Sequence, residues 1–199
     1  MGYTVTVAVP SKPKPATVDD LRAIDDHDRI EIVCGVIVEK AMPSPAHAHG
    51  ESRLAGLLHP FDRRMGRGGP GGWWIMVEIH VEYAVSEIHC HDAAGWRRER
   101  SPSRPSGWPV RLRPDWVCEI VSPKHERRDH VDKPRVLHAA EVPYYWLVDP
   151  EEKILLVQRW TPAGYVVILR ASSGDVVRAE PFDAIDLAVA ELFGDEADE

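Results

Sequence analysis

The stretch Arg113-Pro114-Asp115-Trp116-Val117-Cys118-Glu119-Ile120-Val121-Ser122-Pro123 holds one glutamate, Glu119, inside an apolar run. Residues 116–121 have the β-rich composition and the length of a strand buried in the centre of a sheet. The next regular segment, residues 129–140, is predicted to be a helix with Lys133 in its first turns, and Pro134 is tolerated only there. This order predicts that a carboxylate on a central strand lies beside an ammonium group from the following helix.

Strands and helices alternate along the rest of the chain. Helical spacing of apolar residues, capping residues and Gly or Pro clusters indicate further helices at residues 17–24, 47–65 and 184–192. β-rich runs indicate strands at residues 29–33, 36–40, 73–85, 87–92, 144–148, 154–160 and 165–169. The first two strands flank Cys34-Gly35 and suit a tight hairpin in which Gly supplies a positive φ. Helices around a mixed set of strands predict an α/β or α+β sandwich.

Length and composition indicate one domain. A chain of 199 residues can bury a core without disulfides. Its three cysteines, Cys34, Cys90 and Cys118, are odd in number and lack paired spacing, which favours a reducing cytosol. No export signal precedes residue 14, and no apolar run approaches the roughly 18 residues of a membrane span. We therefore expect a cytoplasmic protein with no membrane partner, comprising a disordered leader (1–16), one domain (17–194) and an acidic tail (195–199).

The formal net charge of −8 at first argues against a nucleic-acid partner, because neutralising phosphates requires Lys and Arg. The charge is unevenly distributed: residues 180–199 hold eight acidic and no basic residues, whereas residues 97–135 hold eleven basic and six acidic ones. Four of the basic residues lie in the polar segment 96–109, which is predicted to be a long exposed loop: Arg97, Arg98, Arg100 and Arg104. With Trp96 and Trp108 they predict a mobile nucleic-acid-binding loop beside the acidic site. The alternative is a solvated, charge-rich loop.

An ordered set of these segments resembles the Uma-type family of putative restriction endonucleases, a branch of the PD-(D/E)xK nuclease superfamily. The segments that carry the resemblance are Arg29-Ile30-Glu31-Ile32-Val33-Cys34-Gly35 with His47, then His91-Asp92, residues 116–123, Lys133 and Tyr144-Tyr145-Trp146-Leu147-Val148-Asp149. Together they extend from about Thr17 to Tyr165. The resemblance implies an α/β protein with the restriction-endonuclease-like fold, a mixed central sheet flanked by helices, that hydrolyses phosphodiester bonds in DNA.

The resemblance also implies an acidic metal site. Asp92 and Glu119 correspond to the two metal carboxylates, and Glu31 completes the cluster from the opposite side. Mg²⁺ held by these carboxylates, with Mn²⁺ as a substitute, neutralises charge on the phosphate and makes a water nucleophilic. The family usually has Pro-Asp where this chain has His91-Asp92, a difference that alters the backbone rather than the ligand.

The chain departs from the superfamily's Glu-x-Lys signature, because Val121 stands where the lysine is expected. Alternate residues of a strand share a face, so that position normally places an ammonium beside the carboxylate. The resemblance implies that Lys133 substitutes from the following helix, with Lys124 and Arg135 as alternatives. We expect Lys133→Ala to suppress cleavage with little loss of stability. The competing interpretation is an exposed Lys133 that pairs with Asp129 one turn away.

Three other site residues have competing interpretations. Asp115 also follows a proline and would share a face with Glu119, but about 13 Å away at roughly 3.3 Å per residue, too far for one ion to bridge. Asp115 is therefore better interpreted as a residue at the start of the strand. Glu31 would face solvent if its strand is half-buried. His47 follows Pro-Ser-Pro-Ala at a helix start, where a histidine is more often a capping or surface residue.

A zinc site is a further alternative. His89-Cys90-His91, together with His47 and His49, offers ligands that suit Zn²⁺. Neighbouring strand residues point to opposite faces, so at most His89 and His91 could share an ion. Cys34 and Cys118 show no Cys-x-x-Cys spacing.

The sequence therefore predicts a Mg²⁺-dependent endonuclease that acts on DNA. A homodimer is expected because enzymes that cut both strands are commonly symmetric. The first alternative is a degenerate nuclease fold that binds nucleic acid or protein without cleaving, since Val121 and His91 replace family residues. The second is a protein whose acidic tail recruits a basic partner.

Overall fold

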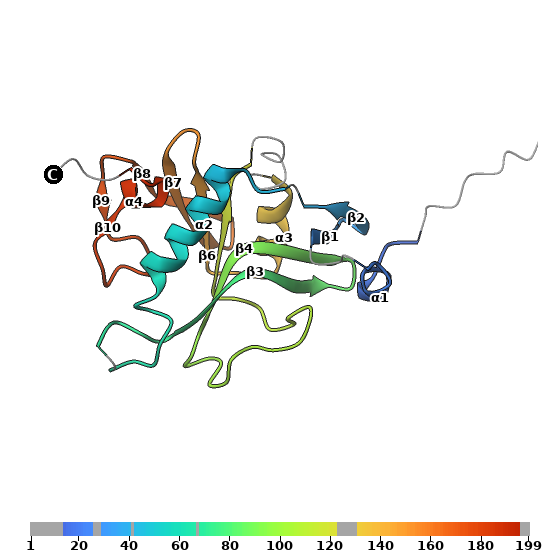
Figure 1. Ribbon diagram of the computed structural model, residues 1–199. Coiled ribbons are helices and arrows are strands. Elements are labelled where there is room, and N and C mark those ends of the chain that lie inside the picture. Colours follow the sequence, from blue (N-terminus) through green and yellow to red (C-terminus); the bar gives the residue numbers. More distant parts are fainter. Residues whose placement is uncertain (1–13, 26–28, 41, 67, 123–130, 196–199) are drawn as a thin grey trace, which may run out of the picture.

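The computed structural model describes residues 14–25, 29–40, 42–66, 68–122 and 131–195, and a large mixed sheet lies at its centre (Figure 1). The strands follow the order β2-β1-β4-β5-β6-β7-β8, and β3 pairs with β4 beside this path. β5 and β6 are parallel, whereas the other neighbours are antiparallel. The strands are β1 (Ile30–Val33), β2 (Val36–Glu39), β3 (Trp73–Ala84), β4 (Glu87–Arg97), β5 (Trp116–Ile120), β6 (Tyr144–Asp149), β7 (Ile154–Thr161) and β8 (Gly164–Ser172).

Helices cover both faces of the sheet. Along β5, Trp116, Cys118 and Ile120 belong to one hydrophobic core and Val117 to another, as the alternation of side chains on a strand requires. The first core contains residues of α2 (Pro45–Leu58) and α4 (Val189–Phe193), which contact each other. The second contains Leu137 of α3 (Lys133–Ala139). The helix that carries Lys133 therefore lies on the face opposite α2.

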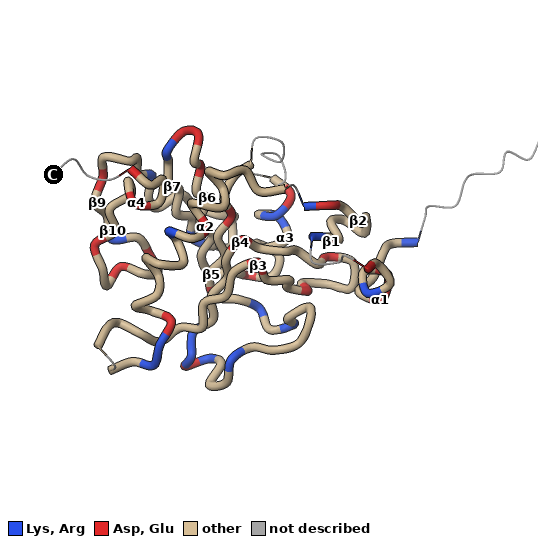
Figure 2. Tube along the Cα trace, in the orientation of Figure 1, with Lys and Arg blue, Asp and Glu red and all other residues tan. Residues whose placement is uncertain are grey.

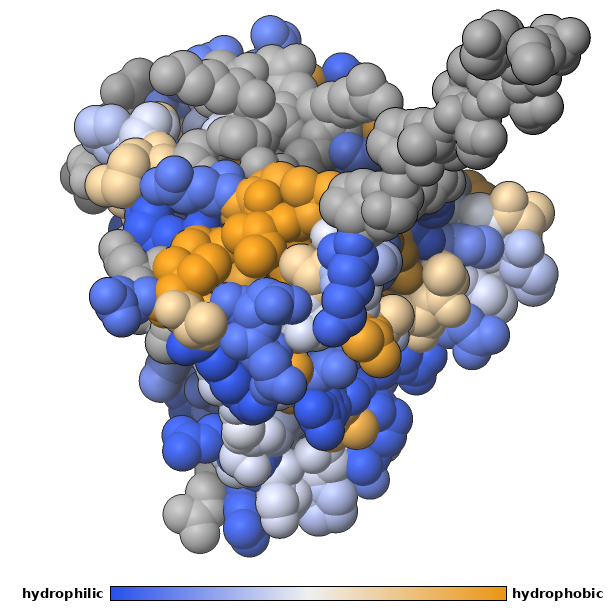
Figure 3. Space-filling model, turned by 90° about the vertical axis from the view of Figure 1, so that its right-hand side faces the viewer, coloured by the Kyte–Doolittle hydropathy of each residue, from blue (hydrophilic) through white to orange (hydrophobic). Residues whose placement is uncertain are grey.

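Local sequence explains the N-terminal elements as predicted. Thr17 N–H donates to Asp20 Oδ2 (2.7 Å) at the start of α1 (Val18–Arg22). Cys34 (φ 53°) and Gly35 (φ 77°) form the β1–β2 turn, and two positive φ angles are what a two-residue type I′ hairpin turn requires. β2 is an edge strand that exposes Val36, and Figure 3 shows hydrophobic residues gathered on this side of the molecule.

Three predicted boundaries are wrong. α2 ends at Leu58 rather than near residue 65, and the C-terminal helix begins only at Val189, after a short hairpin of β9 (Val176–Val177) and β10 (Leu187–Ala188). β4 continues to Arg97, because it pairs with β3 over its whole length. Trp96 is therefore a fully buried strand residue that donates to Leu112 O, not a residue of an exposed loop. The predicted leader and acidic tail fall outside the described residues, apart from residues 14–16 and 195.

The sheet forks at β4. One side of β4 pairs with β3 throughout, while the other side pairs with β1 at Ile88 and with β5 from Ala93 onward. Residues 89–92 lie between these two ladders, so their backbone groups on that side need other partners. Glu31 Oε1 accepts from Cys90 N (2.8 Å), Lys133 Nζ lies 3.5 Å from Cys90 O, and Asp92 Oδ2 accepts from Ile120 N (2.6 Å). Charged side chains thus fill the fork.

Candidate active site

One half of the fork is built around Glu119. Its Oε2 lies 2.6 Å from Lys133 Nζ, and the same ammonium lies 3.5 Å from Glu31 Oε1. All three side chains are at most 2% exposed. Lys133 reaches the carboxylate from α3, as predicted, and Val121 packs in the apolar core on that face. The interpretations of Lys133 as an exposed helix residue and of Glu31 as a solvent-facing residue are wrong.

His91 holds the other oxygen of Glu119. Its Nδ1 lies 2.5 Å from Glu119 Oε1, and its Nε2 lies 2.7 Å from the Tyr83 hydroxyl. Burial, followed by the charge on Lys133, keeps the pKa of His91 well below its ordinary value, so the ring is neutral. A neutral ring with Nδ1–H donating to the carboxylate and Nε2 accepting from Tyr83 satisfies every group in this chain of contacts. The residue that replaces the family's proline therefore orients Glu119.

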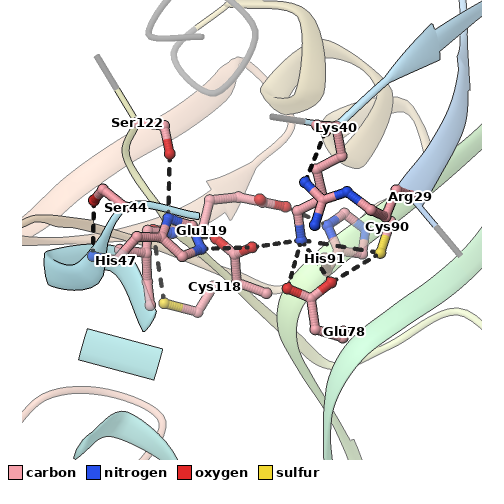
Figure 4. A network of polar contacts seen from close by, with 12 residues as sticks. Arg29, Lys40, Ser44, His47, Glu78, Cys90, His91, Cys118, Glu119 and Ser122 are labelled. Carbon is pink, nitrogen blue, oxygen red and sulfur yellow. Dashed lines mark hydrogen bonds and ion pairs between the residues drawn. The ribbon is translucent and has the colours of Figure 1, made fainter. Parts of the chain in front are cut away.

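The other half of the fork is built around Asp92. Lys40 Nζ lies 2.7 Å from Asp92 Oδ1, and His47 Nε2 lies 3.4 Å from the same oxygen. Lys40 Nζ also lies 2.9 Å from Glu78 Oε2 (Figure 4). Ser122 Oγ lies 3.2 Å from His47 Nδ1. His47 is buried in the first turn of α2, so its interpretation as a surface residue is wrong.

The two carboxylates have opposite pKa shifts. Burial raises the pKa of Glu119 to about 7, and the opposing charge of Lys133 does not cancel this effect. Burial also acts to raise the pKa of Asp92, but the charge on Lys40 and the hydrogen bond from His47 outweigh it and hold that pKa well below its ordinary value. Asp92 is therefore charged throughout the physiological range, whereas Glu119 is poised to titrate near neutral pH.

A second set of possible metal ligands adjoins Asp92. His47, Glu51 and Glu78 each place one ligand atom so that all three atoms lie within 4.8 Å of one another. The carboxylate of Asp92 is within 3.4 Å of the same His47 ring. Oxygen donors with one imidazole suit Mg²⁺ or Mn²⁺. The donor set therefore fits a divalent cation, which would compete with the Lys40 ammonium for Asp92.

Some predicted site residues lie elsewhere. Asp115 accepts from Arg97 N (2.8 Å) and Arg100 Nε (2.8 Å) at the start of β5, so it does not join the cluster around Glu119. Arg135 is exposed and donates to Cys34 Sγ (2.9 Å). Lys124 lies outside the described residues. Of the predicted lysine substitutes that the structure describes, only Lys133 reaches the fork.

The histidines of the predicted zinc site have different polar partners, although the ring centroids of His89 and His91 lie 6.1 Å apart. His89 Nε2 lies 3.1 Å from Glu87, whereas His91 is bound to Glu119 and Tyr83. His47 faces Asp92 instead. The zinc interpretation was based on His89 and His91 sharing an ion, and the described contacts give each histidine a different partner.

Sequence reasoning missed Lys40 and Glu78. Lys40 follows β2 directly, and nothing in its local sequence marks it as a residue of the site. Glu78 has φ 46°, rare for a glutamate, and lies between the pairs Val77↔Ala93 and Ile79↔His91, opposite Asp92. This irregularity in the ladder is visible only in the structure. Glu51 could have been found, since it follows His47 by four residues on one helix face.

Comparison with known proteins identifies the family. Residues 17–190 match Uma2, described as "Putative restriction endonuclease". The chain belongs to the Uma2 family. The crystal structure of a putative nuclease belonging to DUF820 from Anabaena variabilis ATCC 29413 is similar to this Uma2 chain, with a TM-score of 0.70 and 20% identity over 90% of this chain and 98% of that one. No curated protein matches.

These comparisons confirm the predicted fold. The α/β, restriction-endonuclease-like architecture with a mixed central sheet holds for this Uma2 protein, and the family supports a nuclease. Among the helices that the structure describes, none has the length and apolar character needed to cross a membrane. The structure adds the positions of the side chains, with the predicted residues Asp92, Glu119, Glu31 and Lys133 all buried at one fork of the sheet.

Proposed function

We propose that this protein is a divalent-metal-dependent endonuclease that hydrolyses phosphodiester bonds in DNA at the fork between β1, β4 and β5. One observation carries the proposal: Lys133 Nζ lies 2.6 Å from Glu119 Oε2, although the strand has Val121 where the signature lysine belongs. The carboxylate–ammonium pair that the chemistry needs is thus restored from a helix. A buried ion pair built solely for stability has little advantage over apolar residues of similar size.

The metal would bind at Asp92. This carboxylate is fully charged, and His47, Glu51 and Glu78 offer further donors beside it. The sequence instead predicts Glu119 and Glu31 as the other ligands of the ion at Asp92, and this stays a prediction. When bound, Mg²⁺ or Mn²⁺ neutralises charge on the phosphate and activates a water.

The residues around Glu119 would stabilise charge on the phosphate, hold the site in place and exchange a proton. The Lys133 ammonium stabilises negative charge that develops on the phosphate, in a site where water is excluded and its charge is weakly screened. Glu31 holds Lys133 from the other side and anchors the backbone of Cys90. His91 keeps Glu119 in one orientation. A pKa of about 7 suits Glu119 to exchange a proton near neutral pH.

The decisive experiment measures nicking of supercoiled plasmid DNA by the purified protein with EDTA, Mg²⁺ or Mn²⁺. We expect cleavage only with a divalent cation, and Asp92→Asn should lower its rate by roughly 10³-fold or more, since the charge that holds the ion is lost. Asp115→Asn is the matched control, because it removes a buried carboxylate that directly precedes β5 and lies outside the fork. Cleavage by Asp92→Asn at the rate of the control would refute the proposal.

A second candidate function is nucleic-acid binding without cleavage, and it is favoured because the carboxylate oxygens already contact other groups of the chain. Both oxygens of Glu119 and Oδ1 of Asp92 already face cations or donors of the chain itself. A nuclease fold that binds nucleic acid without cleaving would need nothing more. Calorimetric titration with Mn²⁺ separates the two, because a protein that cannot displace Lys40 would show no binding of the ion. The homodimer stays a prediction, tested by light scattering of the purified protein.

A further inference from the structure

A pocket of about 550 Å³ lies at the end of β4 that is distant from Asp92. Its walls come from the loop after α2 and from the ends of β3 and β4, and they include Arg64, Trp73, Arg97 and Arg98. Figure 2 shows Lys and Arg positions along the loops at this end of the sheet, below α2 and β3 in the view. Glu99 is the acidic residue of the lining, so the pocket is cationic.

Of the four predicted nucleic-acid-binding arginines, two are held by polar contacts within the fold, and the other two, Arg97 and Arg104, have no carboxylate partner among the described residues. Arg98 and Arg100 are held by the fold: Arg98 Nε donates to Trp73 O (2.6 Å), and Arg100 Nε donates to Asp115 Oδ1 (2.8 Å). Arg97 is held differently, with its guanidinium carbon 4.5 Å from the centre of the Trp73 ring. Among the described residues, no carboxylate lies within ion-pair distance of Arg97, of Arg64 or of the exposed Arg104.

Arg97 and Arg64 thus offer cationic groups that the described part of the chain does not neutralise. Arg97 is half-buried, so its charge is screened less than that of a fully exposed side chain. An indole face fixes its plane and leaves its N–H groups for a ligand. The planar fork of an arginine matches the geometry of a phosphate group. The ligand that this chemistry favours is a phosphate of a polyanion.

We propose that this pocket binds a backbone phosphate of the same DNA that reaches the fork at Asp92, an inference that depends on the proposed function. Arg97 follows Asp92 by five residues on β4, a separation of roughly 16 Å at about 3.3 Å per residue. Phosphates of one DNA strand advance about 3.4 Å along the helix axis per nucleotide and also wind around that axis, so a separation of this size spans only a few nucleotides of the strand. His47 at the start of α2 and Arg64 beyond its end place both sites along one helix.

The test is binding of a fluorescein-labelled 20-base-pair duplex, followed by anisotropy in EDTA over a series of salt concentrations. Arg64→Ala and Arg97→Ala should each lower the slope of log Kd against log salt by about 0.9, and the double variant by about twice that, because each lost phosphate contact releases one fewer counterion. Arg97→Lys keeps the charge and should keep most of the slope. Arg178→Ala is the matched control, since it removes an exposed arginine paired with Asp186 outside this pocket.

The inference is overturned if the double variant has the affinity and slope of Arg178→Ala, or if the unmodified protein does not bind the duplex at low salt. Because EDTA removes the metal, binding is measured without cleavage. Arginine-dependent binding by a protein that never cleaves would refute the nuclease and leave the phosphate pocket standing. Metal-dependent cleavage with unchanged DNA binding by the double variant would refute the phosphate pocket and leave the nuclease standing.

Discussion

The fork contains two carboxylate–lysine pairs that look alike and behave differently. Asp92 and Lys40 are 2.7 Å apart, and Glu119 and Lys133 are 2.6 Å apart. Both carboxylates are about 2% exposed, but the Lys40 side chain is 13% exposed and that of Lys133 is 2% exposed. Each lysine also contacts a second glutamate, and the exposure of these glutamates differs in the same way: Glu78 beside Lys40 is 46% exposed, whereas Glu31 beside Lys133 is fully buried.

The neighbouring charges, rather than the burial of the carboxylates themselves, explain the opposite pKa shifts. At Asp92, attraction to Lys40 and His47 exceeds the cost of burial, whereas at Glu119 burial exceeds the attraction to Lys133. In the Asp92–Lys40 pair, the open pair, Asp92 is therefore permanently ionised and its partners are more exposed, which suits exchange of one cation for another. The Glu119–Lys133 pair, the closed pair, is fully buried. The pKa of Glu119 lies near neutral pH, so this pair suits an ammonium that stays in place beside a carboxylate that gains and loses a proton.

Removing Lys133 should have the largest effect on this comparison. Lys133→Met leaves Glu119 buried without its cation, and we expect a loss of about 3 kcal/mol or more in the free energy of unfolding at pH 8, measured by urea denaturation. This corrects the expectation from sequence that substitution at Lys133 costs little stability. Cleavage should fall by roughly 10²- to 10³-fold, the usual cost of losing a group that stabilises transition-state charge.

A double variant separates folding from catalysis. Lys133→Met combined with Glu119→Gln removes the buried charge along with its partner, so stability should largely return while cleavage does not. Cleavage at the original rate by a folded Lys133→Met protein would show that Lys133 has no role in the reaction.

The closed pair was predictable from sequence and the open pair was not. An apolar run around Glu119 and a helix that opens with Lys133 are local patterns. The family resemblance paired them, because it implied that Lys133 replaces the lysine expected at the position of Val121. Lys40 and Glu78 meet Asp92 only because three segments converge at one irregular point of the β3–β4 ladder. Contacts between distant segments leave no periodicity in the sequence.

Strand lengths show the same limit. The segment after Asp92 is polar and rich in Arg, and so predicts a loop, but pairing with β3 extends β4 to Arg97. Gly95 allows this packing, since a Cβ there would lie 3.2 Å from both Trp73 and Trp116. Trp96 is consequently part of the core. Tertiary pairing outweighed local composition at this point.

Lys40→Met tests whether the open pair gives way to a metal. Without the ammonium, an ion at Asp92 has no competitor, so we expect the Kd for Mn²⁺ to fall about tenfold, which is about 1.4 kcal/mol, by calorimetry. The variant should be less stable than the original protein in EDTA and regain stability with Mn²⁺. Lys153→Met, which breaks the exposed pair with Asp195, should change neither quantity. Weaker Mn²⁺ binding by Lys40→Met would place the ion away from Asp92.

The smallest expected effect is the pH dependence of the closed pair. The pKa of Glu119 is about 7 in the folded protein and near 4.5 when unfolded, so the folded state binds the extra proton. Its contribution to stability is complete below pH 4.5 and is lost as the pH rises through 7. Between pH 6.5 and 8 this loss is on the order of 1 kcal/mol.

Glu119→Gln isolates that contribution, because glutamine does not titrate. His91 has the opposite sign: its lowered pKa adds stability that is lost as the pH falls below about 6.5, so measurements above that pH avoid it. We expect urea denaturation of the two proteins at pH 6.5, 7.25 and 8 to show the original protein losing stability relative to Glu119→Gln. A constant difference over this range would mean that Glu119 is ionised throughout, and that Lys133 holds it as firmly as Lys40 holds Asp92.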